Sequence, residues 1–263
     1  MSQSSGSLAL TVAYDGAGFA GFARQEGLDT VQGRLESALH TTLRREVLTV
    51  GAGRTDAGVH ALGQVVSFDT AGNEPKDAVL ARSITALAGP GIVVSAVRHA
   101  HPGFSARFDA TAREYRYRIV AGEVPPLFSA RFAWWVRGGL DPGPMREAAA
   151  LLVGEHDFRS FCVTESAAGK RTVRRIEVVE FAEEVVLGEQ CVVVRVVGNA
   201  FLHSMVRVIV GTLVEVGTGR RGPEWVADAL AACERSAAGP TAPAHGLTLW
   251  SVAYPEDVWV SAR

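Results

Sequence analysis

The sequence lacks the features that define several large protein classes. Its only cysteines, Cys162, Cys191 and Cys233, are widely spaced and odd in number. This argues against a disulfide scaffold or a zinc knuckle and predicts a reducing, cytoplasmic compartment. No run of about 18 apolar residues occurs, so we expect no membrane span. Residues 1–7 are polar, without a signal-peptide pattern, and are expected to be disordered.

Lysine is nearly absent, because only Lys76 and Lys170 contribute to the 26 Lys and Arg residues. With 28 Asp and Glu, the formal net charge is −2, which by itself argues against a nucleic-acid-binding protein. A base bias of the genome would also produce an arginine excess. The basic residues nevertheless gather in two segments, one with Arg107, Arg113, Arg116 and Arg118, the other with Lys170, Arg171, Arg174 and Arg175. Local basic segments of this kind can contact phosphate on a neutral protein.

Several catalytic motifs are missing as well. The sequence has no glycine-rich phosphate loop with its lysine and no serine in a nucleophile elbow. Cys162 has no basic helix start nearby that would mark it as a nucleophile. The spacing of Asp56, His60 and His203 matches no familiar zinc or iron motif, so a metal site is disfavoured. We expect neither a metal nor a cofactor.

What the sequence does contain is one pattern of strands and helices written twice. The first copy has expected strands at residues 8–14, 47–50, 63–69 and 91–99, a helix at 30–43 with Thr30 as N-cap, and a helix from near Pro75. After a linker at 101–112, the second copy has expected strands at 113–120, 132–136, 171–181, 190–198 and 246–254, and helices at 142–154, 201–217 and 223–233.

The first copy has the order β-α-β-β-α-β, and the second repeats this order with an added strand at 132–136 and an added helix at 223–233. We therefore predict an α+β fold with two ferredoxin-like halves, residues 8–108 and 109–263, joined into one extended, mostly antiparallel sheet with helices on one face. Single-strand RNA readers share this topology, but their aromatic-rich signature is absent here, and many unrelated enzymes use the same fold. Topology alone therefore does not decide the function.

The segment "VGAGRTDAGVHALGQVVSFDT", residues 50–70, places charged residues among glycines. Such glycines favour tight turns or the close approach of a ligand. Arg54 and Asp56 are two residues apart, so in an extended backbone both side chains leave on one face. A carboxylate beside an arginine stays ionised and can act as a nucleophile or base. The alternative is an ordinary hairpin tip held by an Arg–Asp pair.

A second arginine lies in an apolar setting. In "NAFLHSMVRVIVG", Arg207 is flanked by Val206 and Val208 on an expected helix. A charge there needs a partner, or it must extend to solvent. We expect either that Arg207 reaches solvent or that it pairs with Asp56 across the junction of the two halves.

Six segments in order resemble the tRNA pseudouridine synthase A family: "YDGAGFAGF" from Tyr14, "GRTDAGVHALGQVVSF" from Gly53, "FSARFDATAREYRYRI" from Phe104, "DFRSFC" from Asp157, "NAFLHSMVRVIVGTL" from Asn199 and "APAHGLTLW" from Ala242. The resemblance extends from about Leu8 to Tyr254 and implies the pseudouridine synthase fold. One departure is Phe22-Ala23, where the family usually has Trp-Gln. We expect this change to affect substrate fit more than reaction type.

The resemblance implies a role for each of five residues. Asp56 would be the nucleophile, and Tyr115 would stack on the target uracil and assist removal of the C5 proton. Arg207 would pair with Asp56 and hold it ionised. Arg54 would fill the gap left by the displaced base, and Leu247 would wall the uracil pocket.

The resemblance also implies the substrate and the assembly. The substrate would be uridine at positions 38, 39 and 40, in the anticodon stem-loop of tRNA, gripped by a homodimer without a cofactor. Arg171, Arg174 and Arg175 are candidates for contacts with the RNA backbone. Two alternatives remain: a catalytically silent RNA-binding module on the same fold, and a small-molecule or metal-dependent enzyme on a ferredoxin-like scaffold.

Overall fold

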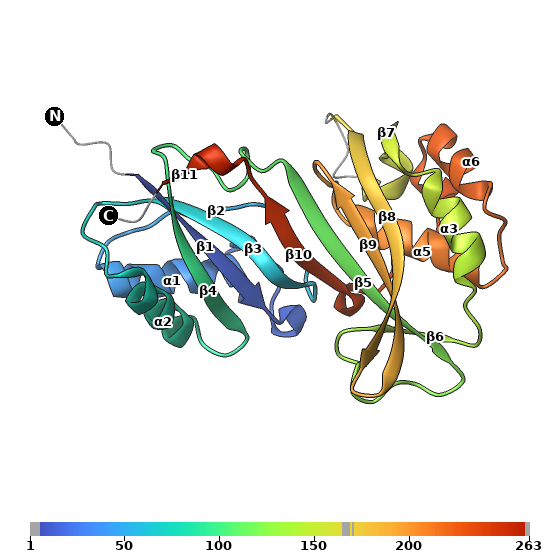
Figure 1. Cartoon of the computed structure of the whole chain (residues 1–263), viewed down its shortest axis with the longest axis horizontal. Coiled ribbons are helices and arrows are strands. Elements are labelled where there is room, and N and C mark those ends of the chain that lie inside the picture. The colour runs from blue at the N-terminus through green and yellow to red at the C-terminus, as the bar shows by residue number, and fades with distance from the viewer. Residues whose placement is uncertain (1–5, 165–168, 170, 261–263) are drawn as a thin grey trace. The chain divides into compact units, whose positions relative to one another are not determined.

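A computed structural model describes residues 6–164, 169 and 171–260 (Figure 1). Most of the predicted polar N-terminus, residues 1–5, and Lys170 of the second basic segment lie outside these ranges. The chain forms two compact units. Unit 1 comprises Met1–Ala112 and Leu249–Arg263, and unit 2 comprises Arg113–Thr248.

Unit 1 is a sheet with two helices. Its elements are β1 (Ser7–Tyr14), α1 (Val31–Leu43), β2 (Val50–Gly51), β3 (His60–Asp69), α2 (Asp77–Ala88), β4 (Ile92–Ala100), β10 (Leu247–Ala253, which enters this unit at Leu249) and β11 (Trp259–Val260). The strand order is β11-β4-β1-β3-β10, and β1 is antiparallel to both β3 and β4. The short β2 pairs with β3.

The alternation of side chains along β1 divides the core of unit 1. Leu8, Leu10 and Val12 are buried on one face of the strand, and the helices contribute the buried Leu35 and Leu80. The intervening residues of β1 point to the other face, because successive strand side chains alternate. On that face Ala9, Val65, Ala100, Phe104 and Ala106 form a second apolar cluster, against which Tyr254 and Trp259 pack.

Unit 2 has the same general plan. Its elements are β5 (Ala112–Gly122), β6 (Trp134–Arg137), α3 (Pro142–Ala150), β7 (Gly154–Asp157), β8 (Val173–Val186), β9 (Glu189–Gly198), α5 (Met205–Gly217) and α6 (Trp225–Ala232). The strand order β5-β9-β8-β7 is antiparallel throughout, whereas β6 pairs with β5 in parallel. The hairpin between β8 and β9 turns at Gly188, as predicted from the sequence.

The predicted α+β class with mostly antiparallel strands is confirmed. Thr30 is the N-cap of α1, where its hydroxyl accepts a hydrogen bond from Gly33 N at 3.3 Å. Helix α5 starts at Met205 rather than at residue 201, because Ser204 has a left-handed φ of 59°. The sequence division assigned residues 249–263 to the second half, whereas the structure groups them with unit 1.

Two further details of the elements differ from the sequence expectation. The strand expected at 47–50 is reduced to the two residues of β2. The short strands β7 and β11 were not expected. None of the helices that the structure describes is long and apolar enough to cross a membrane.

Candidate active site

Asp56 lies in the loop that joins β2 to β3, and its side chain is partly buried. Val59 N donates to Asp56 O at 3.1 Å, which closes a turn with Gly58 at a φ of +79°. This left-handed conformation favours glycine. On the other side of Asp56, Gln64 Nε2 donates to Gly53 O at 2.8 Å. The loop is therefore fixed both before and after the carboxylate.

Thr55, which precedes Asp56, is held through its backbone and its side chain. Phe22 N donates to Thr55 O at 3.0 Å, and the hydroxyls of Tyr14 and Thr55 share a hydrogen bond at 2.8 Å. Burial raises the pKa of Tyr14 to about 12, although its hydrogen bonds to Thr55 and Gln64 oppose the shift. Tyr14 therefore stays a neutral hydrogen-bonding group at physiological pH.

The "YDG" segment packs directly against the Asp56 loop. A Cβ atom on Gly16 would lie 2.0 Å from Val59 O, so only glycine fits this close approach. Gly16 N donates to His60 Nδ1 at 3.0 Å, and the same nitrogen lies 3.1 Å from an Asp15 carboxylate oxygen. His60 thus joins two of the sequence motifs. Among the described residues, no group of three or more His, Cys, Asp or Glu side chains is placed to hold a metal ion.

Arg54 differs from its neighbours in this loop because its side chain is exposed. It makes no hydrogen bond or ion pair with any residue that the structure describes. The alternative of a hairpin tip held by an Arg54–Asp56 pair is therefore wrong.

Phe22, at the departure from the family pattern, is a core residue. Its side chain is 2% exposed, and its ring lies against Gly51, where a Cβ atom would come within 2.4 Å of the ring. The ring also lies 6.3 Å from that of Tyr14, centroid to centroid. The Phe22 ring therefore packs against the start of the Asp56 loop and helps to hold it in place.

In unit 2, Tyr115 lies on β5 opposite Val196 of β9 and is buried. Its ring meets that of Phe201 edge to face, with centroids 5.1 Å apart and an interplanar angle of 85°. Two positions earlier on the strand, an Arg113 guanidinium nitrogen donates to Asn199 O at 2.6 Å. The "NAF" segment before α5 therefore fixes the part of β5 that carries Tyr115.

Arg207 lies on α5 and is bonded to the segment that precedes β10. Its Nε donates to Ala242 O at 2.8 Å, and Ala242 N donates to Arg207 O at 3.1 Å. A Cβ atom on Gly211 would lie 1.8 Å from Pro240 O, so the helix and this segment are in direct contact. The alternative in which Arg207 simply extends to solvent is wrong. The pairing of Asp56, in unit 1, with Arg207, in unit 2, stays a prediction.

The same segment continues to Leu247, a buried residue at the start of β10. The Tyr117 hydroxyl donates to Pro243 O at 2.8 Å, and Gly246 lies so close to the Tyr117 ring that a Cβ atom would come within 2.5 Å of it. Burial raises the pKa of Tyr117, although the charge of Arg207 opposes the shift. We call residues 239–247 the strap. It connects Arg207 to Leu247.

The two basic segments differ in their partners. On β5, Arg116 Nε lies 2.8 Å from a Glu114 oxygen, and Arg118 Nε lies 2.9 Å from a Glu184 oxygen. These charges belong to ion pairs within the sheet.

In the second basic segment, the side chains of Arg171 and Arg175 are exposed. Arg174 is partly buried, and its Nη1 donates to the carbonyls of Arg171 and Val173 at 2.9 and 2.7 Å. Arg174 is therefore less available to a ligand than its two neighbours.

Comparison with known proteins identifies the family. The family described as tRNA pseudouridine synthase matches residues 10–108 and 148–255. The tRNA pseudouridine synthase A of Brevibacillus brevis is 46% identical over 252 residues, covering 94% of this chain and 99% of that protein. The enzyme of the same name from Frankia casuarinae is 44% identical over 261 residues, covering 97% and 92%. This chain belongs to the tRNA pseudouridine synthase family, and its activity is that of an isomerase.

Proposed function

We propose that this protein converts uridine to pseudouridine at positions 38, 39 and 40 of tRNA, in the anticodon stem-loop, with Asp56 as the nucleophile. The observation that carries the assignment of Asp56 is the fixed position of Thr55, whose carbonyl and hydroxyl are both hydrogen-bonded. A nucleophile must be held within a fraction of an ångström of its reacting geometry, and a backbone fixed at the preceding residue supports that requirement.

The chemistry requires a group that holds one reacting partner while the other turns. The N1–C1′ bond breaks, the uracil rotates and C5 becomes joined to C1′. The Asp56 carboxylate bonds covalently to C1′ or to C6 during the rotation and is released when the new bond forms. The proton lost from C5 is balanced by a proton gained at N1. The product is thus an isomer of the substrate, and the balance contains no oxidant or group donor.

The target base must leave its stack before it can react. Extrusion costs a few kcal/mol, and stacking on an aromatic ring returns about 1–3 kcal/mol per base. Tyr115 supplies that ring, and its contact with Phe201 holds the ring plane. Leu247 forms a wall of the uracil pocket. Arg54, which is exposed on its loop, fills the space left by the displaced base.

Arg207 keeps the nucleophile charged in this proposal. A guanidinium beside a carboxylate favours the ionised form, because the opposite charge stabilises it. The hydrogen bonds between Arg207 and Ala242 support the assignment, since they restrict where the guanidinium can lie. Arg207 therefore orients and charges Asp56 and takes no part in bond making.

We also infer a cytoplasmic homodimer that grips one tRNA across both subunits. The three free cysteines fit a reducing compartment in which tRNA is made. The exposed Arg171 and Arg175 are candidates for contacts with the RNA backbone. Sedimentation with and without tRNA tests the assembly, and a protein that stays monomeric at assay concentrations would contradict the dimer.

Tritium release is the direct test of the reaction. A tRNA transcript that carries 5-tritiated uridine should lose tritium to water when it meets the enzyme in the presence of a chelator. Transcripts with cytidine at positions 38, 39 and 40 should release none, and this control separates the proposed site from other uridines. Tight binding without tritium release would instead favour the catalytically silent RNA-binding module.

A further inference from the structure

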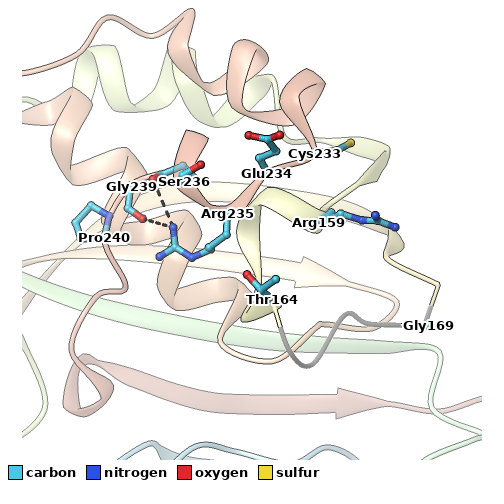
Figure 2. Close-up of a pocket in the computed structure, with 10 residues that line it drawn as sticks. Arg159, Thr164, Gly169, Cys233, Glu234, Arg235, Ser236, Gly239 and Pro240 are labelled. Carbon is cyan, nitrogen blue, oxygen red and sulfur yellow. Dashed lines mark hydrogen bonds between the residues drawn. The ribbon is translucent and has the colours of Figure 1, made fainter.

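A large cavity in unit 2 is not used by the proposed reaction. It has a volume of about 880 Å³ and is lined by Arg159, Thr164 and Gly169 and by residues 233–236 and 238–240, which follow α6. This volume is in the range that holds a ligand larger than a single ion. Figure 2 shows two of its lining residues, Arg235 to the left and Arg159 to the right, with Thr164 below them.

We propose that this cavity binds a backbone phosphate, with its attached nucleotide, of the tRNA on which the enzyme acts. The proposal rests on the proposed function, because it assigns the RNA as occupant. It adds an anion subsite, formed by Arg159 and Arg235, that lies outside the residues assigned to the chemistry.

The positive charge of Arg235 is not neutralised by a protein carboxylate among the described residues. Its Nη1 donates to the carbonyls of Ala238 and Gly239 at 3.4 and 2.8 Å, and its Nη2 donates to the Thr241 hydroxyl at 3.1 Å. All three acceptors are neutral, so the charge is held in place and stays available to an anion. The guanidinium N–H groups that do not take part in these hydrogen bonds can donate to phosphate oxygens.

Arg159 adds a second charge with more freedom. Its side chain is exposed and makes no hydrogen bond or ion pair within the part of the chain that the structure describes. Figure 2 shows it directed away from Arg235, along the rim. An exposed arginine of this kind can change rotamer and turn toward an anion that enters the cavity.

Among the described residues that line the cavity, the positive charges outnumber the negative ones. Its arginines are Arg159 and Arg235, and its carboxylate is that of Glu234. The nearby Asp157 carboxylate is engaged, because its Oδ1 accepts a hydrogen bond from Arg159 N at 3.0 Å.

The strap connects this cavity to the residues proposed for the reaction. Its first residues, Gly239 and Pro240, line the cavity, and Gly239 N donates to the Thr212 hydroxyl on α5 at 2.9 Å. A Cβ atom on Gly239 would lie 2.7 Å from Thr212 Cα, so the contact with the helix is close. Further along, the same strap holds Arg207 and reaches Leu247. An RNA phosphate bound in the cavity would therefore be held at a fixed distance from both residues.

Solvent access favours a polymer over a free nucleotide. Thr164, Gly169, Ser236 and Pro240 all line the cavity and are exposed, so its rim is open to solvent. A polynucleotide needs an open rim because its chain must enter and leave. A site for a free nucleotide is usually enclosed around most of the ligand.

The test is the salt dependence of tRNA affinity for Arg159→Glu. This variant should lower tRNA affinity about tenfold near 0.1 M salt and reduce the slope of log affinity against log salt by about one. Arg159→Lys should restore most of the affinity. Arg82→Glu, an exposed arginine on α2, is the matched control and should change neither quantity.

A second variant, at another residue of the cavity, shows whether the effect of Arg159→Glu comes from the charge of the cavity or from a structural change at Arg159. Ser236→Glu adds a negative charge at the exposed side of the cavity, where the Ser236 hydroxyl makes no hydrogen bond with any described residue, and it should also weaken tRNA binding severalfold. Wild-type affinity and slope in both variants would overturn the subsite. Titration with inorganic phosphate identifies the source of the anion: lost phosphate binding with unchanged tRNA affinity would mean a free anion and would also overturn the proposal.

The proposed function and the subsite fail in different ways. If the wild-type enzyme binds tRNA but releases no tritium, the proposed reaction is wrong whatever the variants do. If the wild-type enzyme releases tritium and Arg159→Glu behaves like it at every salt concentration, only the subsite is wrong.

Discussion

Two groups of arginines in unit 2 have opposite surroundings. On β5, Arg116 and Arg118 each lie within 3 Å of a glutamate oxygen, at 2.8 and 2.9 Å. At the cavity, the Arg235 guanidinium is bonded to carbonyl and hydroxyl oxygens, and the Arg159 guanidinium makes no hydrogen bond or ion pair with any described residue. The arginines of the first group lie close together in the sequence, but glutamates of the protein neutralise their charges. The arginines of the second group lie far apart in the sequence, and no carboxylate of a described residue pairs with their guanidinium groups.

The contrast teaches that the density of arginine along the chain is a poor guide to ligand contacts. Alternate residues of β5 share one face, so Glu114, Arg116 and Arg118 lie in a row, and the neighbouring strands supply Glu180, Glu184 and Arg195. Such a row forms its own ion pairs, as Arg195 does with Glu114 at 3.2 Å. The availability of a charge depends on its neighbours in space.

The largest effect should come from a residue that belongs to neither arginine group. Asp56→Asn should lower turnover by at least a thousandfold, because an amide cannot replace a carboxylate nucleophile. Its tRNA affinity should stay within about tenfold of wild type, since phosphate contacts dominate binding. Single-turnover tritium release and filter binding measure the two quantities. A variant that keeps more than a few per cent of the activity would remove Asp56 from the nucleophile role.

Tyr115 should give the next largest effect and tests whether its hydroxyl is needed. Tyr115→Phe keeps the ring for stacking, so its tRNA binding should be near normal, but turnover should fall about 10²-fold if the hydroxyl assists removal of the C5 proton. Tyr115→Leu should lose activity through weaker capture of the base. Rapid-quench analysis of the products would show where each variant stalls. Wild-type rates in Tyr115→Phe would exclude a role in proton transfer.

Glu114→Gln tests whether the arginines on β5 serve the stability of the sheet rather than the binding of RNA. Glu114 pairs with both Arg116 and Arg195 and is mostly buried, so its loss should lower the free energy of unfolding by about 1–3 kcal/mol. Urea denaturation measures this change. The salt slope of tRNA binding should stay the same, because these charges face each other. Glu123→Gln, in an exposed pair with Arg137, is the control and should change stability by less than about 0.5 kcal/mol. A changed salt slope in Glu114→Gln would place the β5 arginines on the RNA path.

The smallest effects should come from the exposed arginines of the second basic segment. Arg171→Glu and Arg175→Glu should each weaken tRNA binding two- to tenfold and flatten the salt slope slightly, without changing the melting temperature. Arg174→Glu is different, since its guanidinium bonds two backbone carbonyls, and it should also lower the melting temperature. Filter binding across a salt series and differential scanning fluorimetry separate these outcomes. An unchanged slope in the double variant of Arg171 and Arg175 would place both off the RNA path.

Much of the fold was predictable because it depends on short-range patterns. Leu35 and Leu39, four residues apart, both face the core from α1, and Thr30 caps that helix as its position suggests. The start of α5 was not predictable to the residue, because Ser204 is a non-glycine in a left-handed conformation. The two-residue β2 was overestimated, since strand-forming residues before Val50 do not pair in a ladder.

The residue types of the candidate site could be proposed from the sequence, whereas the contacts that support them could not. The charged loop and its glycines indicated a special site, and the motifs indicated which carboxylate to choose. The contact between Gly16 and Val59, by contrast, joins positions far apart in sequence and leaves no local pattern. The contact of Gly211 with Pro240 was hidden in the same way. Interactions of this kind are set by tertiary packing, which periodicity does not encode.

Unit 1 is discontinuous along the chain, and this has a consequence for its synthesis. Its sheet includes β10 next to β3 and β11 next to β4, and the residues of both strands that belong to unit 1 follow unit 2 in the sequence. At about 5–20 residues per second, a ribosome needs on the order of ten seconds to make residues 113–248. During that interval the emerging unit 1 exposes the unpaired edges of β3 and β4. The sheet of unit 1, whose first strands are synthesised first, can therefore be completed only after unit 2 has been synthesised.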